Sequence, residues 1–255
     1  MFGFLRDRRR RKLLAGPFPP HWEVLLRRNV GHYPRLSDAE RARLRDITRV
    51  LVAEKNWEGA GGLTVTEEIR LTVAAQAGLL LLGLDHDYYD RVSAVVVYPG
   101  AFRTPVEEDG WEDDGLSDDP LSGQAVYRGP VILSWDEALA EGREPAAGYN
   151  VVVHEFAHQL DFLDGASDGT PALADPELAR RWGPTMQAAF ETHRAALGRR
   201  QETFFTEHAG DDEAEFFADA SEAFCCRPHD LAAEEPGVFE LLRAYYKLDP
   251  RAWFP

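Results

Sequence analysis

Cysteine is nearly absent from this chain, because its two cysteines, Cys225 and Cys226, are adjacent and cannot join distant segments. A disulfide scaffold is therefore excluded, and a reducing compartment is expected. Long apolar runs are also absent: the longest, around Leu79–Leu82, is far shorter than the roughly 20 residues of a membrane span. The apolar start precedes the basic residues, which is the reverse of the order in a signal peptide. These absences predict a cytoplasmic protein without a membrane span.

The composition is that of an ordinary globular protein. The chain has 255 residues, of which 44% are hydrophobic and 28% are charged. This length allows one sizeable hydrophobic core, and the sequence shows neither an internal repeat nor a clear interdomain linker.

Charge is unevenly distributed along the chain. Residues 1–55 carry 14 basic and 6 acidic side chains, a net charge of +8, whereas the other 200 residues carry a net charge of -24. Because residues 56–255 are so acidic, they repel phosphate groups, and nucleic acid is not expected as a direct partner. The basic run Arg8–Lys12 can bind anions or a membrane surface, but a flexible, solvated tail over residues 1–17 is the favoured interpretation.

The local patterns predict helices with a few short strands. Ser37 and Glu40 form a capping-box signature, and a second helix is expected from Thr66 onward. Apolar runs predict strands over Val95–Tyr98 and Val126–Trp135. From residue 150 onward the chain reads as helical, with breaks at residues 164–171, Gly183-Pro184 and Gly210. The expected fold class is α+β, mostly helical with a small sheet.

The segment from Val151 to Asp161 contains the pattern H-E-x-x-H. On a helix, His154 and His158 are neighbours one turn apart, so their imidazoles can bind one metal ion. Glu155 is placed to reach a water on that metal rather than the metal itself. Asp161 lies on the same face and can orient one of the histidines.

A catalytic zinc site requires a third protein ligand. The three downstream histidines are candidates, and so is an acidic face on a second predicted helix, where Glu215 is the favoured ligand and Glu222 the fallback. Asp219, one turn after Glu215, is expected to hold a metal-binding histidine. The histidine candidates are His193, His208 and His229.

These motifs resemble the Mlc titration factor A family over nearly the whole chain after the basic tail. The helix pair is also similar to the catalytic domain of anthrax lethal factor, a zinc endopeptidase. The residues that carry the resemblance are His154–Asp161 with Asp164-Gly165, Ala214–Ala218 with Ser221–Phe224, Val97–Gly100 with Phe102, Gly129–Trp135 and Gly148–Val152.

The resemblance implies a single zincin-like metallopeptidase domain over residues 18–255. It implies that His154, His158 and Glu215 bind Zn²⁺ and that Glu155 is the general base. One position differs, because the related proteins have a tyrosine seven residues before the third ligand, where this chain has His208. An imidazole can donate a hydrogen bond to a developing oxyanion, so His208 is a candidate for the role of that tyrosine.

The expected function is zinc-dependent hydrolysis of peptide bonds, with a zinc-bound water activated by Glu155, and the family resemblance points to an aminopeptidase. The expected partner of such an enzyme is a peptide or protein substrate. The alternative is a regulatory protein that sequesters a repressor such as the glucose repressor Mlc, with hydrolysis secondary. Hydrolysis of a non-peptide amide is a third interpretation that the motif allows.

Overall fold

In a computed structural model of the chain, the described residues are 2–84, 86–102, 123–125 and 129–254. Their strands form one four-stranded sheet in the order β1-β2-β4-β3. The first three strands in this order are parallel, and β3 is antiparallel to β4 with Gly123 opposite Leu133. The strands are β1 (Trp57–Gly59), β2 (Val95–Tyr98), β3 (Gly123–Ala125) and β4 (Val131–Ser134).

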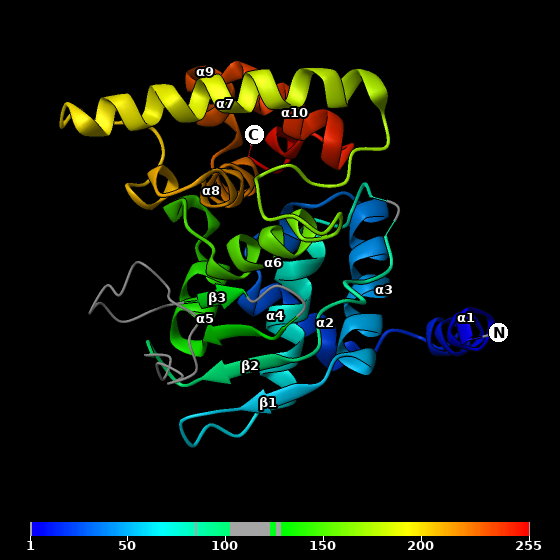
Figure 1. The fold of residues 1–255 in the computed structure, drawn as a ribbon. Coiled ribbons are helices and arrows are strands. Elements are labelled where there is room, and N and C mark those ends of the chain that lie inside the picture. Colours follow the sequence, from blue (N-terminus) through cyan, green and yellow to red (C-terminus); the bar gives the residue numbers. More distant parts are fainter. Residues whose placement is uncertain (1, 85, 103–122, 126–128, 255) are drawn as a thin grey trace, which may run out of the picture.

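Helices cover the sheet in successive layers. Helix α6 lies next to β3 and β4, α8 packs along α6, and α7, α9 and α10 cover α8 from the far side (Figure 1). Helices α2, α3, α4 and α5 complete the half that holds the sheet. Their bounds are α1 (Phe2–Leu14), α2 (Pro20–Asn29), α3 (Asp38–Glu54), α4 (Glu67–Leu79), α5 (Trp135–Arg143), α6 (Val151–Asp161), α7 (Pro176–Gly198), α8 (Glu213–Cys226), α9 (Pro228–Glu234) and α10 (Pro236–Tyr246).

The helix starts follow local capping chemistry. Ser37 and Glu40 make both hydrogen bonds of the predicted capping box before α3, and the Thr66 side chain accepts from the backbone N–H of Ile69 at the start of α4. Both helix starts and the strand Val95–Tyr98 are therefore confirmed. The architecture confirms the predicted α+β class, mostly helical with a small sheet.

Two element boundaries differ from the prediction. The strand expected over Val126–Trp135 is confined to β4, because Pro130 cannot donate to a strand ladder and Trp135 begins α5; residues 126–128 lie outside the described part. The break expected at Gly183-Pro184 is also wrong, since α7 continues through it. Gly183 and Pro184 lie on an exposed part of α7, where water can satisfy the carbonyl that proline leaves unpaired.

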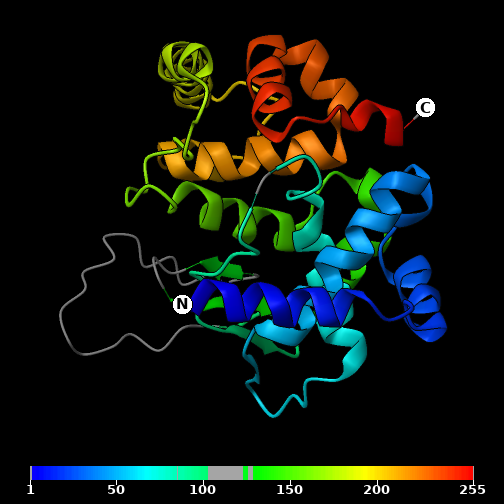
Figure 2. The same ribbon diagram turned by 90° about the vertical axis from the view of Figure 1, so that its right-hand side faces the viewer.

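Helix α1 occupies the segment for which a flexible basic tail was predicted. It lies at the outside of the molecule, clearest in Figure 2, where it crosses the front. The flexibility of residues 1–17 and the boundary at residue 18 stay predictions. In the described part of the chain, every helix is too short or too polar to cross a lipid bilayer.

His32, which follows α2, contacts the C-terminal part of the chain. Its side chain is fully buried, and its Nε2 donates to the carbonyl oxygen of Cys225 at the end of α8 over 3.1 Å. The rings of Trp253 and Phe254 pack edge-on against it, with centroids 5.8 and 5.9 Å away. Its Nδ1 is buried without a hydrogen-bond partner among the described residues. Burial lowers the pKa of His32 to about 4.

This burial predicts that His32 destabilises the fold in acid. Between pH 6.5 and about 4 the unfolded chain binds a proton at His32 that the folded chain excludes, so stability is complete above that window and is lost as the pH falls through it. At pH 5 the loss amounts to about 2 kcal/mol.

Urea denaturation at pH 7 and pH 5 tests this expectation. The His32→Gln variant retains an N–H donor but cannot titrate, so its pH-dependent loss should be smaller than that of the wild type by about 2 kcal/mol. His32→Asn serves as a second variant if the first does not fold. Equal pH dependence in wild type and variant would show that His32 is not held neutral.

Candidate metal centre

The N-terminus of α6 is fixed by buried polar groups. The Asn150 side chain accepts a hydrogen bond from the Val153 N–H at 2.9 Å and donates to Gln76 Oε1 at 2.8 Å. The Val151 N–H donates to the carboxylate of Glu141 at 2.6 Å. Because the first N–H groups of a helix have no partners inside the helix, these bonds determine where α6 begins and how it is oriented.

Helix α8 presents its acidic side chains to α6 because its aromatic side chains are buried elsewhere. Phe216, Phe217 and Phe224 are at most 1% exposed and belong to the hydrophobic core. Asp212 caps the helix by accepting from the backbone N–H of Glu215 at 2.9 Å. This packing leaves Glu215 on the side of α8 that faces α6, within 3.1–3.3 Å of the histidines of that helix.

The structure brings His154, His158 and Glu215 together. His154 Nε2 lies 3.1 Å from Glu215 Oε2, and His158 Nε2 lies 3.3 Å from Glu215 Oε1. The two imidazole rings are 5.1 Å apart between centroids. One possible ligand atom from each of the three residues lies within 4.8 Å of the others. Two imidazole nitrogens and a carboxylate oxygen form a donor set that suits a divalent metal ion, so the residues fit the expected group.

Glu222 connects the N-terminus of α6 with this cluster. One of its carboxylate oxygens accepts from the backbone N–H of Asn150, and the other lies 3.3 Å from His154 Nδ1. An imidazole that binds a metal through Nε2 has Nδ1 free to donate to a carboxylate, which fixes the orientation of its ring. Glu222 is therefore placed to orient His154.

The roles predicted for Asp219 and Asp161 are wrong in this structure. Asp219 accepts hydrogen bonds from the backbone N–H and the hydroxyl of Thr206. Asp161 accepts from the backbone N–H of Gly169 at 3.1 Å. Neither carboxylate makes a hydrogen bond to a histidine of the cluster. The spacing of seven residues keeps Glu222 on the same helix face as Glu215, but the sequence patterns predict Glu222 only as a fallback metal ligand and not as the partner of His154.

Glu155 lies beside the cluster, between α6 and the terminal strand β3. Its side chain is 6% exposed, and burial raises the pKa of its carboxyl to about 7 despite the nearby histidines. A Cβ atom at Gly123 of β3 would lie only 2.4 Å from Glu155 Oε1, so the strand backbone approaches this carboxylate closely. The sequence patterns did not predict β3 or its contact with Glu155.

His208 lies next to Glu215, in the short 3₁₀ helix η3 (His208–Gly210) that precedes α8. Its Nε2 is 3.4 Å from Glu215 Oε2, and its Nδ1 is 2.5 Å from Asp211 Oδ2. The side chain is 65% exposed, so it borders the cluster from the solvent side. The other two histidine candidates lie elsewhere: His193 packs edge-on against Phe205, and His229 contacts the carbonyl of Phe254.

Strong charge interactions hold the three residues together. Burial alone would lower the pKa of His154, but its hydrogen bonds to Glu215 and Glu222 hold that pKa well above the ordinary value. Burial alone would raise the pKa of Glu215, but the two histidines hold it well below the ordinary value. The cluster thus places an ionised carboxylate against two imidazoles, of which that of His154 favours the cationic form, and a bound cation would replace this positive charge.

Comparison with known proteins gives matches along nearly the whole chain. The family model described as glucose-regulated metallo-peptidase M90 matches residues 4–247. An uncharacterised protein of Synechocystis is 32% identical over 250 residues, which is 96% of this chain and 90% of that protein. A protein named Mlc titration factor A from Serratia proteamaculans is 30% identical over 224 residues, which is 85% of this chain and 83% of that protein.

A further relative carries the same name. The Mlc titration factor A of Pectobacterium atrosepticum is 28% identical over 239 residues, covering 91% of this chain and 87% of that protein. The pairing of the H-E-x-x-H helix α6 with the glutamate-bearing α8, beside a small sheet with an antiparallel terminal strand, fits the predicted zincin-like fold.

The close approach of β3 to α6 generates a prediction about Gly123. A methyl group at residue 123 would meet Glu155 and the Val151 side chain at 2.4–2.7 Å, so Gly123→Ala should destabilise the protein by about 1–3 kcal/mol through overpacking. Thermal unfolding measures this change. Gly183→Ala on α7 is the matched control, because a methyl group there would have nothing within 4 Å, and it should keep or raise the midpoint. Equal midpoints for Gly123→Ala and wild type would contradict the close approach.

Proposed function

The chain belongs to the glucose-regulated metallopeptidase family M90, and we propose that it hydrolyses peptide bonds as a zinc-dependent aminopeptidase. The observation that carries the proposal is the meeting of His154, His158 and Glu215 between α6 and α8, with Glu155 beside them. A zinc ion bound by the three residues would supply a Lewis acid for a water molecule and for the scissile carbonyl.

The chain's own groups would then manage the protons. A carboxylate oxygen of Glu155 would take a proton from the attacking water while the water oxygen forms its bond to the carbonyl carbon. The same carboxyl would deliver that proton to the amine nitrogen as the C–N bond breaks. Its position between α6 and β3 limits access by bulk water, which favours direct transfer between this oxygen and the reacting groups.

His208 is the second proposed catalytic residue. Its exposed position beside Glu215 allows its N–H to reach a substrate oxygen without leaving the solvent edge of the site. A hydrogen bond from this group would stabilise the negative charge that develops on the carbonyl oxygen. In this role His208 would take the place of the tyrosine that the family resemblance implies at this position.

A peptide or protein substrate suits the position of β3. This strand is the last in the order of the sheet and runs antiparallel to β4 beside Glu155. An extended peptide can add to such a strand through backbone hydrogen bonds, which brings its peptide bonds close to α6. The two cysteines are free and buried, in keeping with the proposed cytoplasmic location.

The printed names of the relatives support a second candidate function. Several are called Mlc titration factor A, so a repressor protein such as Mlc is a proposed binding partner of this chain. In that case the acidic surface would recognise the repressor, and hydrolysis would be secondary. No direct contact with nucleic acid belongs to either proposal.

Glu155→Gln separates the two functions. The variant should retain zinc, because Glu155 is not one of the three proposed ligands, but its kcat on peptides should fall at least about 10²-fold with the loss of the general base. Hydrolysis of a panel of peptides with free and blocked N-termini measures the effect and tests aminopeptidase specificity. Undiminished hydrolysis by this variant would overturn the mechanism, whereas lost hydrolysis with intact repressor binding would show that both functions coexist.

Zinc affinity tests the ligand assignment. Glu215→Gln should abolish stoichiometric zinc binding, and Glu222→Gln should weaken it by about 10–100-fold because His154 loses its orienting partner. Glu213→Gln changes an exposed carboxylate on the same helix and should bind like the wild type. Competition titration with a chromophoric chelator gives the three dissociation constants. Tight binding by Glu215→Gln together with loss in Glu222→Gln would show that the third ligand is assigned wrongly.

A further inference from the structure

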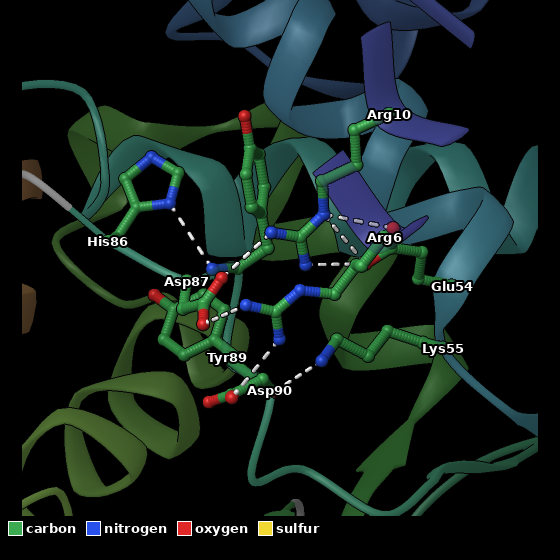
Figure 3. Close-up of polar contacts among 9 residues, drawn as sticks. Arg6, Arg10, Glu54, Lys55, His86, Asp87, Tyr89 and Asp90 are labelled. Carbon is green, nitrogen blue, oxygen red and sulfur yellow. Dashed lines mark hydrogen bonds and ion pairs between the residues drawn. The ribbon is translucent and has the colours of Figure 1, made fainter. Parts of the chain in front are cut away.

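Helix α1 is attached to the body of the protein by one face, and Arg10 is its main anchor. Arg10 is 8% exposed and forms a two-pronged ion pair with Glu54 of α3, with N–O distances of 2.6–3.1 Å. Its Nη1 also donates to Asp87 Oδ1 at 2.7 Å (Figure 3). Its guanidinium lies 4.4 Å from the centre of the Tyr88 ring. A buried arginine with three such partners determines which face of α1 is turned inward.

Further contacts attach both ends of the helix to the body of the protein. Arg6, one turn before Arg10, pairs with Asp87 at 2.5 Å and with Asp90 at 3.5 Å (Figure 3). At the other end, Arg49 of α3 donates to the carbonyl oxygens of Leu14 and Gly16 at 3.2 and 2.9 Å. The acidic residues of the body that pair with α1, namely Glu54, Asp87 and Asp90, thus contact its inner face, whereas Asp7 of α1 itself is exposed.

The outward face of α1 combines cations with apolar side chains. A helix turns by about 100° per residue, so five side chains of α1 point away from Arg6 and Arg10, within an arc of about 120°. Two of them are apolar and exposed, Phe4 by 66% and Leu5 by 58%. The other three, Arg8, Arg11 and Lys12, are cationic and form no ion pair with any described residue. The outward face, as we define it, consists of Phe4, Leu5, Arg8, Arg11 and Lys12.

We propose that the outward face of α1 docks onto the surface of an anionic lipid bilayer. Cations spaced along an interfacial helix contact lipid phosphates, and neighbouring apolar side chains enter the boundary between headgroups and acyl chains. The rest of the molecule, with a net charge of -24 after residue 55, is repelled by the same surface. This contrast orients the protein with α1 toward the membrane, and α1 lies at the edge of the molecule in Figure 1 and across its front in Figure 2.

The exposed apolar pair favours a bilayer over other polyanions. A nucleic acid or an acidic protein surface would pair with the cations, but it would gain little from Phe4 and Leu5 next to them. In a bilayer, both side chains leave water together. The proposal does not depend on the metal centre, because none of its residues belongs to α6 or α8.

Co-sedimentation with vesicles tests the proposal on the full-length protein. Wild type should bind vesicles of phosphatidylcholine with 30% phosphatidylglycerol at low salt, and it should not bind pure phosphatidylcholine vesicles. Each lost cation weakens such binding about fivefold. The variant with Arg8→Glu and Lys12→Glu should therefore bind at least about 25-fold more weakly. Arg181→Glu with Arg199→Glu, an equal charge change at exposed positions outside α1, should bind better than the α1 variant by about tenfold or more.

The apolar pair is tested separately. Phe4→Ser with Leu5→Ser should weaken vesicle binding and leave the affinity for double-stranded DNA of equal phosphate concentration unchanged. Leu5→Cys can be labelled selectively with an environment-sensitive fluorophore, because Cys225 and Cys226 are buried, and its emission should shift to shorter wavelength on the anionic vesicles.

Three outcomes would overturn the proposal: no binding of wild type to the anionic vesicles, equal weakening by the two charge-reversal variants, or DNA binding as tight as vesicle binding with no effect of the apolar pair. The last of these would identify a general polyanion surface instead. Thermal unfolding of each variant verifies that exposed substitutions on α1 leave the fold intact.

Discussion

The approach of a partly buried carboxylate on α8 to two imidazoles on α6 constrains the rest of this structure. An ionised carboxylate that loses most of its contact with water is costly unless opposite charge and hydrogen bonds compensate it, and Glu215 has His154 and His158 within 3.1 and 3.3 Å. The two helices must therefore lie side by side over this turn. The aromatic packing of α8 and the polar capping of α6 both serve to hold that alignment.

Buried acidic groups do more than bind the proposed metal. Glu222 contacts both the backbone that starts α6 and the ring of His154, so one carboxylate couples the position of the helix to the orientation of a ligand. On the opposite side, the absence of a side chain at Gly123 lets β3 approach Glu155. The site therefore lies between two elements: α8 supplies carboxylates, and β3 limits the space around Glu155.

Much of this arrangement could be predicted from local sequence, and the rest depends on contacts between distant segments. The H-E-x-x-H spacing and the polar face of residues 213–226 indicated the cluster because helical periodicity alone brings those side chains onto one face. The partner of His154 could not be derived in this way: Asp219 and Glu222 both lie near that face, and only the packing of α8 against α6 places Glu222 at His154 and Asp219 at Thr206. Nor could the pattern reveal β3, whose three residues carry no strand signature, or the attachment of α1 through Arg10.

The location of bound metal tests the account most directly. A crystal of the zinc-loaded protein, measured with X-rays above and below the zinc absorption edge, should show one anomalous peak between His154 Nε2, His158 Nε2 and the carboxylate of Glu215. The Glu222 carboxylate should lie outside the coordination sphere and contact His154 Nδ1. An anomalous peak coordinated by Glu222 or His208 in place of Glu215, or no peak between α6 and α8, would contradict the account.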